Sequence, residues 1–510
     1  MRIKLLLSLG LLLVISFACN EDDLVQLNPN LVTPDKFFQD AGQLETAVLS
    51  GYASLRSQHM TLRHYYFIHD QMDDDHLATS ANQIEPLLVV GQQNASSLVI
   101  RQHFDAHYDM IHRMNTALDG IAGNETVDDA TKLNLEAEAK FLRGWSYNEV
   151  ATLWGRAPIY TTRALSLDEY APISERDAVF AQAQSDLRFA MDNLPEDRPG
   201  SEIGRATKGA AMGFLARSLM QSGNVAGAKP ILQQIVDSGK YSLNENFGDN
   251  FTEENYFTPE SLFEVVFAQN GAYNWDDAGD SNWGGGNSRS ARAQEYGPFW
   301  RNIIPSSEAL NAFASEVKGD RYTDPRFAET IIIEGQTYLG GTEEFVLNRN
   351  SDPIEYNGEE IWANFYKYGV YYKEVPGGFR LSNTNFILMR YADVLLLLAE
   401  AEVRTDGDLD KARSLINQVR ARAGAPNLDD SGIANGSTDE LMAAVIKERE
   451  VELMSEQVRG RDLRRWHAAG IVNAEAILGY KEGKFVLPIP QDEITNNPMV
   501  SQADQNPGYQ

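Results

Sequence analysis

Aromatic and polar side chains gather between residues 273 and 300, and the chemistry they offer is non-covalent. Flat rings stack on the apolar faces of a small-molecule ligand, while amides and carboxylates bind its hydroxyl groups. Gly284 to Gly286 loosen the backbone between the rings. The candidate ligand contacts are Tyr273, Trp275, Trp283 and Trp300, set among Asn274, Asp276, Asp277, Asp280, Asn282 and Asn287.

Trp275 and Trp283 are the strongest of these candidates. A tryptophan in a loop rich in Gly, Asn and Asp has few core partners in the neighbouring sequence. The alternative is that these indoles fill a small satellite core beneath the loop. The same two interpretations apply to Trp300.

His103 and His107 are four residues apart, a spacing at which two helical side chains can share a metal ion. The segment reads HFDAH and lacks the glutamate that a zinc-protease motif places after its first histidine, so we expect helix-packing or surface histidines. The chain also contains no G-x-S-x-G elbow and no G-x-x-x-x-G-K-[ST] loop. We therefore expect no catalytic residue, no metal site and no cofactor.

The elements that must position these residues are mainly helices. From Asp128 to about Trp154, Ala137, Phe141 and Trp145 recur at i, i+4 and i+8 and define one apolar face. A second helix is expected to begin near Phe386. Its apolar positions are Leu388, Tyr391, Ala392, Leu395, Leu396, Leu398, Ala399 and Val403.

Helix hairpins follow from the turn residues. Asp408 is a plausible N-cap for a partner helix that ends at Gly424. A similar unit runs from Thr207 to Gly239, with Pro230 tolerable in its first turns. These hairpins predict degenerate tetratricopeptide-like repeats. Charged residues on such helices usually form solvated or interhelix ion pairs, and we expect this of a group that could otherwise look like a catalytic set. The group consists of Arg420, Arg422, Glu448, Arg449, Glu450 and Glu452.

Residues 241–385 differ from these helical blocks. They hold short apolar runs such as 262–267 and 330–333, broken by Gly, Asn, Asp and Pro. We expect loops, short helices and small strands. An irregular excursion of this length usually carries function on a rigid scaffold.

Composition limits the possible ligands. Against 44 basic residues the chain has 73 acidic ones, for a net charge of -29. This charge repels nucleic acids and anionic lipids, and it disfavours polyanionic ligands unless a basic pocket overrides it. A neutral ligand is therefore expected. Because the chain has one cysteine, an internal disulfide and Cys-based metal or redox motifs are excluded.

That cysteine, Cys19, ends an apolar run that begins behind Arg2 and Lys4. The pattern predicts a secretory signal with Cys19 as the lipid acceptor of a bacterial lipoprotein, although Phe17 makes the lipobox loose. An ordinary signal peptide with an incidental cysteine is the alternative. The residues Asn20 to Asp23 look like an acidic export signal to the outer leaflet, or like a solvated tail.

Five segments together resemble the SusD/RagB family of nutrient-binding lipoproteins. They are residues 136–158 (EAEAKFLRGWSYNEVATLWGRAP), 205–223 (RATKGAAMGFLARSLMQSG), 390–424 (RYADVLLLLAEAEVRTDGDLDKARSLINQVRARAG), 447–466 (KEREVELMSEQVRGRDLRRW) and 485–509, with its LPIP and QNPGY pieces. The resemblance implies a mainly α fold, with a tetratricopeptide-like helical-hairpin scaffold and an irregular, loop-rich ligand-binding half. It implies non-enzymatic capture of oligosaccharides above a SusC-type TonB-dependent transporter, outside the outer membrane.

The resulting division of the chain is a signal peptide (1–18), a tether (19–40), a helical part (41–240), a glycan-binding insertion (241–385) and a C-terminal helical part with an extended tail (386–510). By resemblance, Asp73, Asp74 and Asp75 in the segment DQMDDDH face ligand, and Arg380 and Asn385 present further contacts. The three aspartates are equally consistent with a calcium site or a solvated turn.

Two other functions remain open: a surface glycoside hydrolase, which needs two carboxylates across a cleft, and a tetratricopeptide scaffold that binds only proteins or peptides. For the leading interpretation the charge favours a neutral polysaccharide, a glucan such as laminarin or a fructan. Peptide or glycopeptide cargo is also possible.

Overall fold

The computed structural model describes residues 37–79, 93–164, 166, 168–267, 290–297, 300–314, 324–347, 352–373, 382–405, 407–430, 437–479 and 484–509. Cys19 and the acidic residues after it, together with Tyr273, Trp275, Trp283 and Arg380, lie outside this described part.

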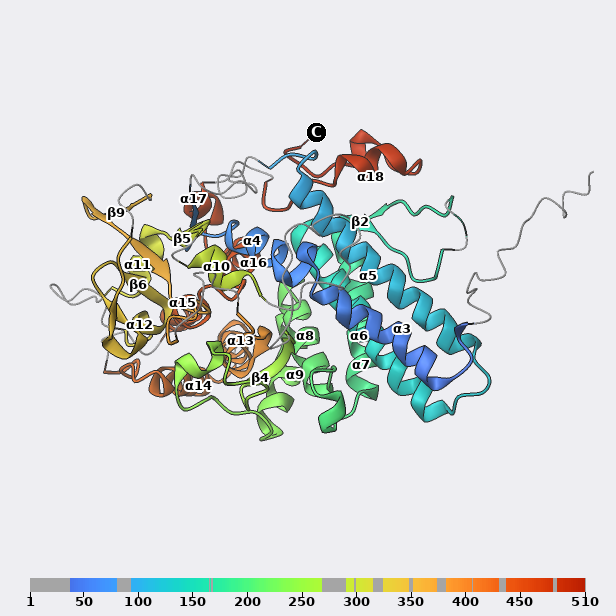
Figure 1. The fold of residues 1–510 in the computed structure, drawn as a ribbon, viewed down its shortest axis with the longest axis horizontal. Coiled ribbons are helices and arrows are strands. Elements are labelled where there is room, and N and C mark those ends of the chain that lie inside the picture. Colours follow the sequence, from blue (N-terminus) through green and yellow to red (C-terminus); the bar gives the residue numbers. More distant parts are fainter. Residues whose placement is uncertain are drawn as a thin grey trace, which may run out of the picture.

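Seven helices form the first half of the scaffold. They are α3 (Ala41–Leu55), α4 (His64–Asp70), α5 (Leu98–Gly123), α6 (Asp129–Leu153), α7 (Arg176–Asn193), α8 (Lys208–Gln221) and α9 (Val225–Asp237). Successive helices pack against one another from α5 to α9, and α9 then packs against α13 (Tyr391–Arg404). Figure 1 shows the long helices α3, α5, α6 and α7 side by side.

The predicted helix from Asp128 is confirmed as α6. Asp128 is its N-cap, and its side chain accepts a hydrogen bond from the Thr131 amide. The predicted apolar face is buried, with Ala137, Phe141 and Trp145 at most 1% exposed. Because Gly144 lies where α6 meets α7, a Cβ there would stand 3.0 Å from the Ala183 carbonyl oxygen.

The predicted hairpins are also confirmed. The helices α8 and α9 pair across the turn at Gly223, which has φ +86. The Asp408 side chain caps α14 (Leu409–Arg422) by accepting from the Lys411 amide, and Gly424 follows with φ +71. Two further helices, α15 (Thr438–Leu453) and α16 (Arg459–Ala468), complete this end.

The helix expected to begin near Phe386 begins five residues later, at Tyr391. Residues Phe386–Arg390 instead form strand β12, antiparallel to β4 (Ser261–Val265). A continuous apolar run fits a buried strand as well as a buried helix, and here a partner strand far away in sequence decides between them.

The excursion between the helical blocks consists of short elements, as expected. Its described part contains η4 (Phe247–Phe251), β4, α10 (Arg292–Tyr296), β5 (Ile303–Pro305), α11 (Ser307–Ala312), α12 (Phe327–Thr330), β6 (Ile331–Ile333), β7 (Thr337–Tyr338), η5 (Leu339–Gly341), β8 (Glu343–Glu344), β9 (Ile354–Tyr356), β10 (Glu359–Ile361) and β11 (Ala363–Phe365). All its sheets are two-stranded: β4 with β12, β6 with β11, β7 with β8, β9 with β10, and β5 with β1 (His76–Ala78). Of these elements, β5, β6, β9, α11 and α12 lie at the opposite side of the molecule from α3 and α6, whereas β4 lies in the middle, beside α9 and α13 (Figure 1).

A shared apolar core joins the irregular half to the scaffold. The Phe263 ring of β4 lies 5.0 Å from Phe141 of α6 and 6.0 Å from Phe214 of α8, edge-on to both. The C-terminal segment also bonds to the scaffold, because the Leu487 amide donates to the Leu153 carbonyl and the Asn506 side-chain amide donates to the Trp154 carbonyl.

The remaining short elements are β2 (Ala157–Pro158) with β3 (Ile173–Ser174), η2 (Gln58–Leu62), η3 (Gly200–Glu202), α17 (Ala474–Leu478), α18 (Gln491–Asn496) and η6 (Gln502–Asp504). Within the described residues, no helix combines the length and apolarity needed to cross a bilayer.

Candidate functional site

Trp300 is the only one of the four predicted aromatic contacts within the described residues. Its side chain is half-buried, so the indole is not sealed in the core. The Arg63 guanidinium carbon lies 6.0 Å from the indole centre, and Arg63 is paired with Glu295 of α10 at 2.6 Å. The contact roles of Tyr273, Trp275 and Trp283 stay predictions.

The acidic segment after α4 lies inside the molecule. Asp73 is 6% exposed, and its Oδ1 accepts from the Asp75 amide (3.0 Å) and faces His76 Nδ1 (2.9 Å). Asp74 receives two hydrogen bonds from Arg459, each of 2.8 Å. Protein donors therefore reach Asp73 and Asp74, two of the three aspartates that were expected to bind ligand hydroxyl groups.

Asp75 differs from its two neighbours. It is fully buried, and neither carboxyl oxygen has a hydrogen-bond partner among the described residues. Burial and the nearby charge of Asp74 raise the pKa of Asp75 well above its usual value, which favours the neutral acid. The backbone beside it is held by the Ser306 amide, which donates to the Asp75 carbonyl.

His76 stands between a serine and an aspartate, in the order of a hydrolase triad. Its Nε2 lies 2.8 Å from Ser455 Oγ, while its Nδ1 faces Asp73. A second carboxylate, Asp70 Oδ2, lies 3.8 Å from the same Nε2. Burial lowers the pKa of His76, but Asp73 and Asp70 outweigh it and the net shift is upward.

The two carboxylates that raise the pKa of His76 favour its charged form, in which both ring nitrogens donate to protein acceptors. The same cluster offers one ligand atom each from Asp70, Asp73 and His76 within 4.8 Å of one another, which is a metal-site spacing. Both ring nitrogens of His76 already have protein partners, Asp73 and Ser455. We interpret the cluster as a tie between α4 and the α15–α16 loop, where Ser455 has φ +59.

Asn385 is buried at the end of β12. Its amide nitrogen donates to Glu264 at 2.7 Å, and its oxygen accepts from the Phe267 amide at 3.0 Å. Asn385 thus joins the ends of β12 and β4.

His103 and His107 are helix-packing residues, as the sequence indicated. Both are fully buried on α5; His103 Nδ1 lies 2.6 Å from the His59 carbonyl oxygen, and the two Nε2 atoms are 3.3 Å apart. Burial lowers the pKa of His103 to about 4, so its ring is neutral at ordinary pH.

Glu448, Arg449 and Glu452 of α15 form buried ion pairs with other elements, which is the interhelix alternative of the prediction. Glu450 pairs with the partly exposed Lys447 on the same helix.

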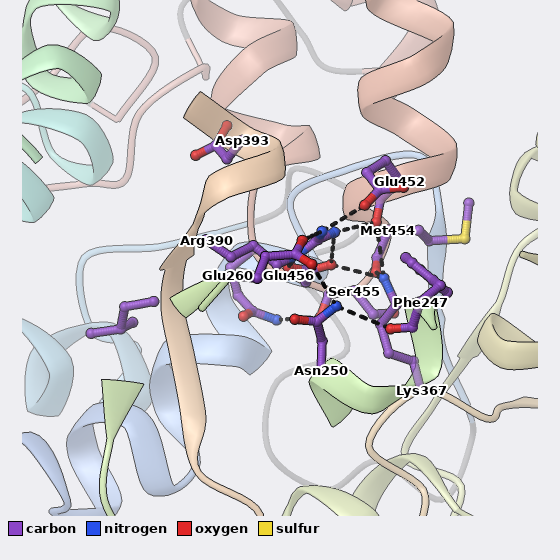
Figure 2. Close-up of polar contacts among 12 residues, drawn as sticks. Phe247, Asn250, Glu260, Lys367, Arg390, Asp393, Glu452, Met454, Ser455 and Glu456 are labelled. Atoms are coloured by element: carbon purple, nitrogen blue, oxygen red, sulfur yellow. Dashed lines mark hydrogen bonds and ion pairs between the residues drawn. The ribbon is translucent and has the colours of Figure 1, made fainter. Parts of the chain in front are cut away.

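Arg390 is at the centre of the buried pairs, bonded to Glu260 at 2.7 Å, Glu452 at 2.6 Å and Glu456 at 2.7 Å. Lys367 adds a bond of 2.9 Å to Glu456 (Figure 2). Burial opposes ionisation, yet the arginines around Glu452 lower the pKa of that carboxyl well below its usual range.

Two family models match the chain. One, described as SusD family, matches residues 259–483; the other, described as starch-binding associating with outer membrane, matches residues 41–220. The chain belongs to the SusD family. A SusD-like protein P25 of Formosa agariphila is 26% identical, covering 100% of both chains, and a SusD-like protein P2 of the same bacterium is 25% identical over 96% of each.

Solved SusD-like structures share the fold. One described as a laminarin binding SusD-like protein has a TM-score of 0.73 and 23% identity, covering 92% of this chain and 100% of its own. The surface glycan-binding protein A of Bacteroides fluxus gives a TM-score of 0.73 with 20% identity, over 92% of this chain and 100% of that one. A SusD homolog of Bacteroides thetaiotaomicron has a TM-score of 0.73 and 22% identity, covering 93% of this chain and 98% of its own.

The segments that mark the SusD family supply buried contacts between distant elements. Arg143 holds Asp186 with two bonds of 2.7 Å between α6 and α7. Arg461 of α16 reaches Glu149 of α6 at 3.0 Å, and Glu149 also meets His69 at 3.0 Å. These marks therefore identify the scaffold and not the ligand.

Sequence reasoning missed the partners that the irregular half contributes to the ion pairs. Arg326 bonds Glu452 at 2.9 Å, and Glu260 joins Arg390 and Arg422. No local signal reveals these contacts, since the partners are separated by more than a hundred residues; a charged residue within an apolar run, such as Arg390 after FILM, is the only hint.

Proposed function

We propose that the protein is a cell-surface glycan-binding lipoprotein, anchored through Cys19, that captures oligosaccharides and delivers them to a SusC-type TonB-dependent transporter. The observation that carries the proposal is the match to two family models, one described as SusD family over residues 259–483 and one described as starch-binding associating with outer membrane over residues 41–220. The named laminarin-binding and surface glycan-binding structures support the same role.

The proposed grip is the aromatic segment from Tyr273 to Trp300. Trp275 and Trp283 supply stacking faces there, and the neighbouring Asn and Asp side chains bind hydroxyl groups. Trp300, half-buried beside Arg63, stands at the described end of this segment. A net charge of -29 favours a neutral glucan or fructan over a uronate polymer. No covalent step is required.

Affinity electrophoresis against a panel of polysaccharides tests this function. We expect slower migration in gels with a neutral polysaccharide, laminarin first among them, and unchanged migration in gels with alginate. The soluble products of each incubation are assayed for new reducing ends. New reducing ends would establish a hydrolase instead, and migration unchanged by every glycan would favour a scaffold that binds only proteins or peptides.

Anchoring and delivery have separate tests. In the native host, wild-type protein is expected in the outer-membrane fraction, accessible to externally added protease, and co-purifying with a TonB-dependent transporter. Cys19→Ala is expected to release the protein from that fraction. Retention of the Cys19→Ala variant at wild-type levels contradicts lipid anchoring, and purification free of any transporter contradicts delivery.

A further inference from the structure

A cavity of about 310 Å³ opens in the irregular half, between η4, α12 and the chain that follows β11. None of its lining residues belongs to the proposed grip or to the acidic segment after α4. The residues that matter for its chemistry are Asp249, Phe251, Glu329, Tyr366, Tyr368 and Tyr372. Its volume is at the lower end for small-molecule sites, which suits one sugar ring better than a chain.

Two tyrosines are held rigidly on the cavity wall. Tyr366 is half-buried and stacks on Tyr371 with ring centres 5.1 Å apart and planes at 17°, so its opposite face is the one that a ligand can meet. The Tyr372 hydroxyl oxygen accepts a hydrogen bond of 2.7 Å from the Glu253 amide, and this bond fixes the ring. Fixed aromatic faces cost little entropy when a ligand stacks on them.

Two carboxylates line the same cavity, and the one ammonium group that also lines it, that of Lys367, is paired with Glu456 at 2.9 Å. Asp249 and Glu329 form no ion pair within the described residues, although the neighbouring acids Glu260, Glu452 and Glu456 all do. The Glu329 carboxylate lies over the Gly248 backbone, where a Cβ would stand 2.7 Å from Oε2. Burial and the charge of Asp249 raise the pKa of Glu329. Asp249 Oδ2 accepts a hydrogen bond of 3.2 Å from the Asn246 side-chain amide, and the carboxylates keep further acceptor positions for a ligand.

The backbone along the cavity is strained. Tyr368 and Val370 are buried non-glycine residues with φ +61 and +56, a conformation that costs of order 1 kcal/mol or more per residue. The Tyr368 hydroxyl is buried and has no hydrogen-bond partner among the described residues. Strained backbone and an unsatisfied polar group are typical of binding sites.

We propose that this cavity is a second carbohydrate subsite, separate from the aromatic segment, which binds one neutral pyranose ring through tyrosine stacking and through hydroxyl groups donated to Asp249 and Glu329. Aromatic walls coordinate calcium poorly, since that ion requires six to eight oxygen ligands. A cationic amine ligand would bind through cation–π contact with a ring face. At Phe251 the ammonium group of Lys367 already makes that contact, 4.5 Å from the ring centre.

Saturation-transfer NMR and calorimetry with methyl β-D-glucopyranoside test the subsite in the Trp275→Ala/Trp283→Ala background, which removes the proposed main grip. We expect this background to retain weak binding of the glucoside. Adding Asp249→Asn and Glu329→Gln is expected to weaken that binding at least fivefold. Glu360→Gln, at an exposed position on β10, is the matched control and should leave binding unchanged. Melting temperatures verify that every variant is folded.

The outcomes separate the subsite from the proposed function. Glucoside binding that is absent in the tryptophan-free background, or equal with and without the carboxylate changes, overturns the subsite while leaving the main grip standing. Tight polysaccharide binding that survives loss of the tryptophans contradicts the main grip instead. Calcium chloride or ethylamine that binds through Asp249 and Glu329 while the glucoside does not would also overturn the subsite.

Discussion

At the residue scale, the central feature is the buried charge around Arg390. Burying a guanidinium is costly unless carboxylates and hydrogen bonds compensate it, and three glutamates do so here. Figure 2 shows how these side chains from β12, α15 and the irregular half converge. The sequence predicted ion pairs but not their burial, because burial depends on distant chain.

Removing one of these charges should be strongly destabilising. Glu452→Gln keeps the side-chain shape but leaves Arg326, Arg390 and Arg422 short of a buried carboxylate. We expect the free energy of unfolding to fall by about 3–5 kcal/mol, measured by urea denaturation.

The matched control is Glu196→Gln, whose partner Lys208 is 39% exposed and which is itself 61% exposed. It should change the free energy of unfolding by less than about 1 kcal/mol, since water screens such a pair. Equal effects of the two substitutions would contradict a structural role for the buried cluster.

At the element scale, local signals located the helices well. Capping residues and apolar period placed α6 and the hairpins α8–α9 and α13–α14. They did not reveal β12, because its strand conformation depends on pairing with β4 more than 120 residues earlier. For the same reason the inward placement of Asn385 could not be predicted, because its partners Glu264 and Phe267 lie on and beside β4. Asp73 bonds to the nearby Asp75 amide and His76, and its burial depends on distant chain such as Ser455, which meets His76.

The contact between α6 and α7 is close enough to be tested with one methyl group. Gly144→Ala places a Cβ 3.0 Å from the Ala183 carbonyl oxygen and from two side chains of α7. We expect a loss of about 1–3 kcal/mol in the free energy of unfolding, because the helices must move apart. Gly123→Ala, near the end of α5 with open space around it, should be neutral or slightly stabilising. A stabilising Gly144→Ala would show that the two helices are not so close.

Acid should weaken the ion pair between Glu400 of α13 and Arg465 of α16 and so lower the free energy of unfolding. Burial alone would raise the pKa of Glu400, but the Arg465 guanidinium outweighs it and lowers the pKa to about 2 from an ordinary value of 4.5. A lowered carboxyl pKa stabilises the fold above the unfolded value, and that contribution is lost as pH falls from about 4.5 towards 2.

For Glu400 this contribution is roughly 3 kcal/mol. Urea denaturation midpoints across this pH range should therefore fall more steeply for the wild type than for Glu400→Gln. Parallel curves for the two proteins would contradict the assignment.

At the scale of the whole molecule, fold and family could be predicted from the sequence, whereas the ligand site could be predicted only as a segment. The family marks include residues such as Arg143, whose contact with Asp186 joins α6 to α7 in this scaffold. Trp300 and its neighbours have no comparable motif, since a stacking face depends on exposure and on what the rest of the fold leaves open. The buried placement of Asp73 leaves the aromatic segment as the main candidate grip.

Calorimetric titration of the glycan selected by the polysaccharide panel into wild-type and Trp275→Ala/Trp283→Ala protein tests this claim most directly. Tyr170→Ala, at an exposed ring in the loop between β2 and β3, is the control. We predict that the double substitution weakens binding at least tenfold, whereas Tyr170→Ala binds as tightly as the wild type. Equal affinity of the double variant and the wild type would contradict a carbohydrate grip in the aromatic segment.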